Sequence, residues 1–237
     1  MFNFSNLENT SFTSNAGAYL RPYGIYDVNL TKIEKTTLKG SKDPNAEYPI
    51  IALEFTGCGD DKGVFTTNIF IPTTEADGER KMLKNANGHE NPVPSRFEEF
   101  QFTLMQIISV LNPDGAKKIQ ENGNKLQAAL EKDFKKGIDL FIDLILKGLN
   151  GKNNVTTKLK LVGRNNNGTI YAAIPRACGI NKAGEIFPVN FIGENLFFTN
   201  YEITQQKAYQ NAKPTNMDKV ETSGDKSADV DLDDIEL

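Results

Sequence analysis

Apolar and polar residues alternate with a period of two in the first part of the chain, which is the pattern of a half-buried strand. Over residues 24–38, for example, Tyr26, Val28 and Leu30 alternate with polar neighbours. The alternation slips near Lys32, and such a slip predicts a β-bulge. The first element is therefore expected to be a long strand that bends.

Two more strands are expected over residues 49–56 and 64–72, where apolar residues again share one face. The short turn between them, residues 57–63, predicts that they form a hairpin. A long polar segment, residues 73–94, follows. A loop of this length inside a domain is usually functional or flexible.

Apolar residues take up helical spacing from residue 95 onward. Ser95 and Glu98 have the spacing of a capping box, and the helix that they open is expected to end after Leu111. A second helical region is expected over residues 116–149, with an interruption near Gly123.

The period of two returns after the helices. Strands are expected over residues 156–161 and 169–177, joined by a tight turn at Asn167-Gly168. Residues 186–192 and 196–203 are expected to add a closing hairpin.

This order of elements predicts a mainly β (α+β) domain. Three strands, a helical segment and further strands are the order of a five-stranded oligonucleotide-binding barrel, here with an enlarged helical insertion at about 95–150 between strands three and four. The expected organisation is an N-terminal arm over 1–18, this domain over 19–207, and a disordered acidic tail over 208–237.

The C-terminal segment divides the chain into two electrostatic parts. Residues 218–237 carry eight acidic residues and two lysines, a net charge of −6; since the whole chain carries −4, residues 1–217 carry about +2. So acidic a segment, without aromatic residues, cannot bury enough apolar surface to offset its ordering entropy. It either only solubilises the protein, or docks on partner proteins and competes with nucleic acid for the domain.

The composition is that of a globular protein, with 38% apolar and 24% charged residues. The N-terminus lacks the pattern of a signal peptide, and no window approaches the roughly 18 apolar residues of a membrane span. We therefore expect a cytoplasmic protein without membrane contact. Cys58 and Cys178 have no partners at metal-ligand spacing, so we expect reduced thiols and no zinc.

Catalytic motifs are missing from the sequence. His89 is the sole histidine, and neither a phosphate-binding glycine loop nor a nucleophile elbow occurs. Asp60 and Asp61 are adjacent acids without the further ligands that Mg²⁺ or Ca²⁺ needs, so a metal-dependent nuclease is a remote alternative. We expect a protein that is not an enzyme, with no catalytic residues, no metal and no cofactor.

Binding residues are better supported. Proteins hold single-stranded nucleic acid with aromatic rings that stack on bases and with cations that line a groove. If Leu159 and Leu161 point to the core, neighbouring side chains of the same strand point away from it. The same parity, with Arg176 near a strand end, predicts one exposed face with six candidates: Phe70, Lys158, Lys160, Arg164, Tyr171 and Arg176. The alternative for each ring is a packing contact, and for each cation a solvated strand face. Further candidate cations lie in the first strand and the loops: Lys35, Lys39, Lys42, Arg80, Lys81 and Lys84.

The chain resembles single-stranded DNA-binding proteins of bacteriophages in three features: the run from Tyr19 to Val28 (YLRPYGIYDV), the strand order up to Ile203, and the terminus DLDDIEL. The resemblance implies a barrel that protects single-stranded DNA during replication, recombination or repair, and a tail that recruits partner proteins. The tail residues implied are Asp229, Asp231, Asp233, Asp234, Ile235, Glu236 and Leu237. The chain departs from the bacterial pattern of a terminal proline and aromatic residue, and its helical segment is longer than a minimal barrel requires.

The alternative function belongs to another class. In a phage structural or assembly protein without nucleic-acid binding, an arm with Phe2, Phe4 and Phe12 and the long helices would form subunit contacts.

Overall fold

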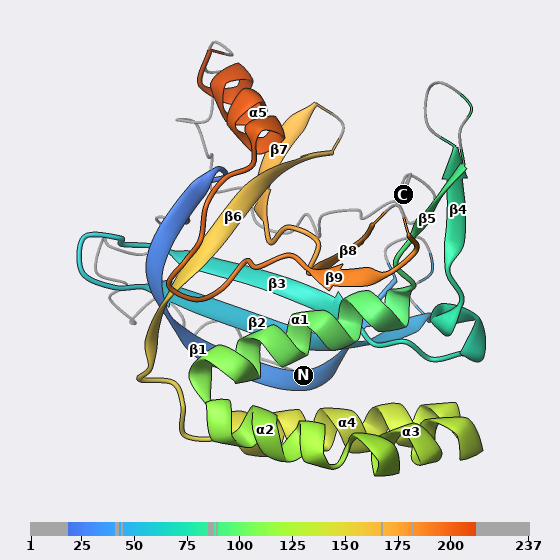
Figure 1. The fold of residues 1–237 in the computed structure, drawn as a ribbon. Helices are drawn as coiled ribbons and strands as arrows, with labels where there is room; N and C mark the ends of the chain where they lie inside the picture. Colours follow the sequence, from blue (N-terminus) through green and yellow to red (C-terminus); the bar gives the residue numbers. More distant parts are fainter. Residues whose placement is uncertain are drawn as a thin grey trace.

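A five-stranded antiparallel sheet forms the centre of the protein (Figure 1). The structure is a computed structural model that describes residues 19–211 except 41–42, 44, 85–87, 89, 167 and 182. In the order in which they pair, the strands are β3 (Val64–Phe70), β2 (Glu47–Gly57), β1 (Gly24–Lys39), β6 (Thr156–Asn166) and β7 (Thr169–Ala173). The expected arm over 1–18 and most of the expected tail over 208–237 lie outside the described residues.

Strand β1 bends because it pairs with two partners. Its first six residues pair with β6, while the part from Val28 onward pairs with β2. The register with β2 shifts between Leu30 and Lys32, which confirms the predicted bulge. The hairpin of β2 and β3 is confirmed as well.

The prediction of a closed oligonucleotide-binding barrel was wrong. The described strands form an open sheet in which β3 and β7 are opposite edges, and the fold is mixed α and β with five α-helices in the described part. No described strand bridges the two edges, because the chain after β7 turns away from the sheet. It forms a separate small sheet of β8 (Cys178–Ile180) and β9 (Ile186–Pro188).

The expected closing hairpin was also wrong. After β9, Phe191 and Ile192 enter the core, and the Lys160 N–H donates to the Phe191 carbonyl at 2.7 Å. The next element is not a strand but helix α5 (Asn200–Asn211). Its start is fixed by Thr199 and Glu202, whose side chains each accept a hydrogen bond from the other's backbone N–H.

The described part of the long segment after β3 contains regular secondary structure. It contains a 3₁₀ turn, η2 (Glu75–Gly78), and a hairpin of β4 (Lys81–Lys84) and β5 (Glu90–Val93) that projects from the body (Figure 1). Arg80 holds the base of this hairpin, since its guanidinium donates to the Glu98 carboxylate at 2.6 Å and to the Gly184 carbonyl at 2.9 Å.

Four helices follow β5, within the bounds expected for the insertion: α1 (Arg96–Leu111), α2 (Pro113–Glu121), α3 (Gly123–Lys132) and α4 (Phe134–Leu149). The capping box of Ser95 and Glu98 is confirmed, as is the interruption at Gly123. The four helices gather on one side of the sheet, with α1 next to the strands (Figure 1).

One apolar core joins the sheet to these helices. Its fully buried side chains include Phe55, Leu104, Ile142, Leu159 and Phe191, which come from β2, α1, α4, β6 and the segment after β9. The helices thus occupy the inner face of the sheet, and the outer face of β6 is left for α5. None of the helices in the described ranges is long and apolar enough to cross a membrane.

Candidate functional site

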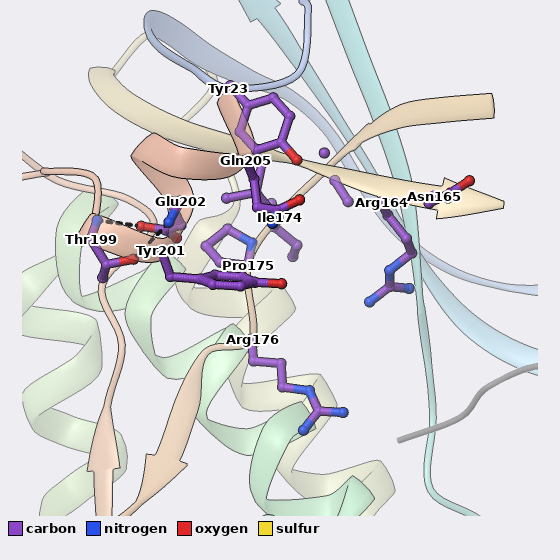
Figure 2. Close-up of a pocket in the computed structure, with 13 residues that line it drawn as sticks. Tyr23, Arg164, Asn165, Ile174, Pro175, Arg176, Thr199, Tyr201, Glu202 and Gln205 are labelled. Atoms are coloured by element: carbon purple, nitrogen blue, oxygen red, sulfur yellow. Dashed lines mark hydrogen bonds between the residues drawn. The ribbon is translucent and has the colours of Figure 1, made fainter. Parts of the chain in front are cut away.

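A groove of about 450 Å³ lies between the β6–β7 hairpin, the segment after β7 and helix α5. Its walls combine aromatic rings, two arginines and a proline, and Figure 2 shows how these side chains surround it. The lining residues used below are Tyr23, Arg164, Pro175, Arg176, Tyr201 and Glu202.

The alternation along β6 decides which side chains reach this side of the sheet. Leu159 and Leu161 are fully buried in the core, so the predicted parity of the strand is confirmed. Arg164 therefore lies on the outer face and is exposed. In the register of the hairpin, Tyr171 of β7 is the direct partner of Arg164, and it is 53% exposed. Cross-strand partners have Cβ atoms about 5 Å apart, so this ring and this cation are neighbours.

The two arginines of the groove project toward the same open side (Figure 2). Within the described part of the chain, the Arg164 guanidinium has neither a hydrogen bond nor an ion pair. The Arg176 Nε lies 3.4 Å from Glu99 Oε1, which is an ion pair without hydrogen-bond geometry. Both guanidinium groups therefore retain donors for a further anion.

Glu99, from α1, is the ion-pair partner of Arg176 and is also within electrostatic reach of Arg164. Burial raises the pKa of its carboxyl group, and the positive charges of Arg176 and Arg164 oppose that rise. One carboxyl group thus faces two guanidinium groups and does not neutralise both.

Tyr23 lines the groove at the foot of β1. Its φ of 58° is unusual for a residue with a side chain and turns the ring onto β6. The ring fits because position 163 is glycine: a Cβ there would lie 2.5 Å from the ring. Burial raises the pKa of Tyr23, with smaller contributions from Tyr201 and Tyr209, so its hydroxyl stays protonated and can donate a hydrogen bond.

Tyr201, from the first turn of α5, was not predicted as a site residue. Its ring is 73% exposed and extends into the groove beside Pro175 (Figure 2). The sequence does contain a signal for it, since Thr199 and Glu202 have capping-box spacing and place Tyr201 at the start of a helix.

Lys160 was expected on the exposed face, and that expectation was wrong. The lysine does lie on the outer face of β6, but it is only 2% exposed because the segment leading into α5 covers it. Its ammonium group donates to Glu202 at 3.0 Å and to the Phe197 carbonyl at 3.2 Å, and it lies 5.8 Å from the centre of the Phe198 ring.

The Glu202 carboxylate is the counter-ion of this buried lysine. Burial alone would raise the pKa of Glu202, but hydrogen bonds from the Thr199 N–H and from Lys160 together hold it below its ordinary value. The Glu202 carboxyl group is therefore ionised at neutral pH.

Two other candidates lie apart from the groove. The Lys158 ammonium group is paired with Asp27 at 2.8 Å. Phe70 is exposed at the other edge of the sheet, with three strands between β3 and β7, and its ring contacts Tyr48 edge-on at 6.3 Å. The structure thus brings together Arg164, Tyr171 and Arg176, and leaves Phe70 and Lys158 elsewhere.

Three of the six further candidate cations form ion pairs with acidic residues in the described part of the chain. Lys35 pairs with Asp139, Arg80 with Glu98 and Lys84 with Glu90. Lys42 lies outside the described residues, as do His89, Asn167 and the seven tail residues.

The described residues form no metal-binding cluster, and Cys178 is not a reactive thiol. No group of three potential metal ligands occurs there, and Asp61 serves the turn after β2 by accepting the Asp27 N–H at 2.8 Å. Burial raises the pKa of the Cys178 thiol to about 12, and nearby Glu99 adds to the rise, so this thiol stays protonated and is a poor nucleophile.

The comparisons with protein-family models, with curated proteins and with solved structures each found no match for this chain.

Proposed function

We propose that this protein binds single-stranded DNA in the groove between β6, β7 and α5, without catalysing a reaction. The observation that carries the proposal is the presence in one groove of two arginines with free donors, Arg164 and Arg176, together with the exposed ring of Tyr201. The exposed ring of Tyr171 is the cross-strand partner of Arg164. Cations for the backbone and rings for the bases are what single-stranded nucleic acid requires.

Each part of the groove has a role in this proposal. The planar guanidinium groups of Arg164 and Arg176 hold phosphate oxygens with paired hydrogen bonds. Tyr171 stacks on a base, and Tyr201 stacks on another while α5 is in place, each contact worth about 1–3 kcal/mol in known cases. The Tyr23 hydroxyl donates a hydrogen bond to a phosphate oxygen or to a base oxygen. Phe70 and Lys158 do not contribute in the groove.

The direct test is a gel shift with labelled oligo-dT at 50 and 200 mM salt. The phosphate contacts of the two arginines alone contribute about −1.4 to the salt slope, which makes binding at least about sevenfold weaker at the higher salt. No shift at the lower salt would contradict the proposal and favour the assembly protein without nucleic-acid binding.

The biological setting is also proposed. Binding would protect unpaired DNA during phage replication, recombination or repair in the cytoplasm of the host cell. The acidic residues Asp229, Asp231, Asp233, Asp234 and Glu236, with Ile235 and Leu237, would recruit partner proteins of replication or recombination.

Deletion of residues 229–237 is expected to leave oligo-dT binding unchanged or to strengthen it up to about tenfold, because it removes five carboxylates that compete with the strand for the arginines. Fluorescence anisotropy with the oligonucleotide measures the change. A matched variant keeps the length and replaces the five acids with their amides; it should bind like the deletion. Weaker binding by both variants would contradict the competitive role of the tail.

A further inference from the structure

Helix α5 is held on the sheet almost entirely by polar contacts. None of its twelve residues is buried. Its contacts with the body include the ion pair of Glu202 with Lys160, a hydrogen bond from the Gln206 amide to the Tyr23 carbonyl at 2.9 Å, and the rings of Tyr209 and Tyr23 at 5.7 Å. An element that contributes no fully buried side chain to the core belongs to the part of a protein that opens most easily.

Helix α5 is attached to β6 through a buried ion pair, Lys160 with Glu202, which is an unusual way to hold a helix on a sheet. Burying a lysine and a glutamate costs desolvation, and an apolar pair of similar size often stabilises a protein as well or better. An ion pair differs from an apolar pair in one respect: when α5 leaves, water or another anion can take the place of the carboxylate.

The position of Lys160 suggests which anion that is. It lies between Lys158 and Arg164 on the outer face of β6, and alternate residues of a strand are about 7 Å apart. With α5 in place, Lys160 is covered and does not line the groove. With α5 displaced, Lys160 becomes accessible on the same face of β6 as Arg164, from which Val162 separates it, while Lys158 stays paired with Asp27.

We propose that α5 is a displaceable cover, and that Lys160 becomes a phosphate contact when a DNA strand replaces Glu202 as its partner. This inference rests on the proposed binding of single-stranded DNA. In the exchange, the Lys160 ammonium group passes from the carboxylate to a phosphate oxygen, and the Glu202 carboxylate passes into water. In the free protein, the Glu202 carboxylate therefore occupies the position that a DNA phosphate takes in the complex.

Hydrogen exchange on the full chain tests the cover directly. Amides of α5 should exchange at least about fivefold faster in the presence of saturating oligo-dT than in the free protein, while amides of α1 should not change. Slower or unchanged exchange in α5, with the oligonucleotide bound, would overturn the inference and leave the proposed function standing. Absence of oligonucleotide binding would overturn both.

The variant Glu202→Gln tests the exchange of partners. It loosens α5 and should bind oligo-dT at least about fivefold more tightly, whereas Glu202→Gln with Lys160→Gln should lose that gain. Glu34→Gln is the matched control, because it makes the same change in net charge at an exposed ion pair with Lys32. Weaker or unchanged binding by Glu202→Gln would contradict the inference.

A second variant keeps the test independent of the buried charge. Tyr209→Ala removes the ring contact with Tyr23 and leaves the ion pair in place. It should also tighten binding, by a smaller factor, and unchanged binding in both variants would show that α5 is a fixed wall of the groove.

Discussion

Replacement of both Arg164 and Arg176 by glutamine is expected to weaken oligo-dT binding about 100-fold at low salt. A hydrogen bond to a charged group contributes about 1.5 kcal/mol or more, and two such contacts amount to about 3 kcal/mol. The salt slope should also decrease in magnitude by about 1.4, because the two phosphate contacts and their released counterions are lost. Anisotropy titrations at several salt concentrations measure both quantities.

The control is the double variant Lys132→Gln, Lys147→Gln. Both lysines are exposed on helices of the insertion, and their loss changes the net charge by the same amount. This control should bind within about twofold of the wild type. An equal loss in both double variants would mean that overall charge, and not the groove, governs binding.

Phe191→Ala is expected to lower the free energy of unfolding by about 3–5 kcal/mol, since it removes a fully buried ring from a close-packed core. Phe191 fastens the segment between β9 and α5: its carbonyl accepts the Lys160 N–H, and its own N–H donates to the Gln106 side chain at 3.3 Å. Without the ring, the contacts of this segment with β6 and α1 are weakened. Chemical denaturation followed by circular dichroism measures the loss.

Phe197→Ala provides the comparison. Its ring is 73% exposed, so the same change in side chain should alter the free energy of unfolding by at most about 0.5 kcal/mol. A loss below about 1 kcal/mol for Phe191→Ala would contradict its placement in the core.

The features that the sequence predicted correctly depend on local or periodic signals. The bulge near Lys32 was visible as a slip in alternation, and the start of α1 as the capping box of Ser95 and Glu98. The parity of β6 followed from Leu159 and Leu161, because a strand that buries one face fixes the direction of every side chain.

Barrel closure could not be predicted in this way. Whether the two edge strands meet depends on contacts between distant segments, and here the chain after β7 forms its own small sheet. The order of elements is the same for an open and a closed sheet, so it does not distinguish them.

Helix α5 was missed because its apolar residues suggested a strand, although Thr199 and Glu202 carried the signal for a helix start. Because the helix was missed, the predicted exposure of Lys160 was wrong as well. Parity placed Lys160 on the correct face, but parity does not show what covers a face. Tyr201 was missed for the same reason, and Tyr23 because its role depends on an unusual backbone angle and on Gly163.

Photocrosslinking of oligo-dT that carries 5-iodouracil, followed by mass spectrometry, tests the central claim most directly. The proposed groove predicts crosslinks at Tyr171, Tyr201 or Tyr23, which line one side of the molecule. Crosslinks confined to Phe70 and Tyr48, at the opposite edge of the sheet, or to helices α2 to α4 would contradict it.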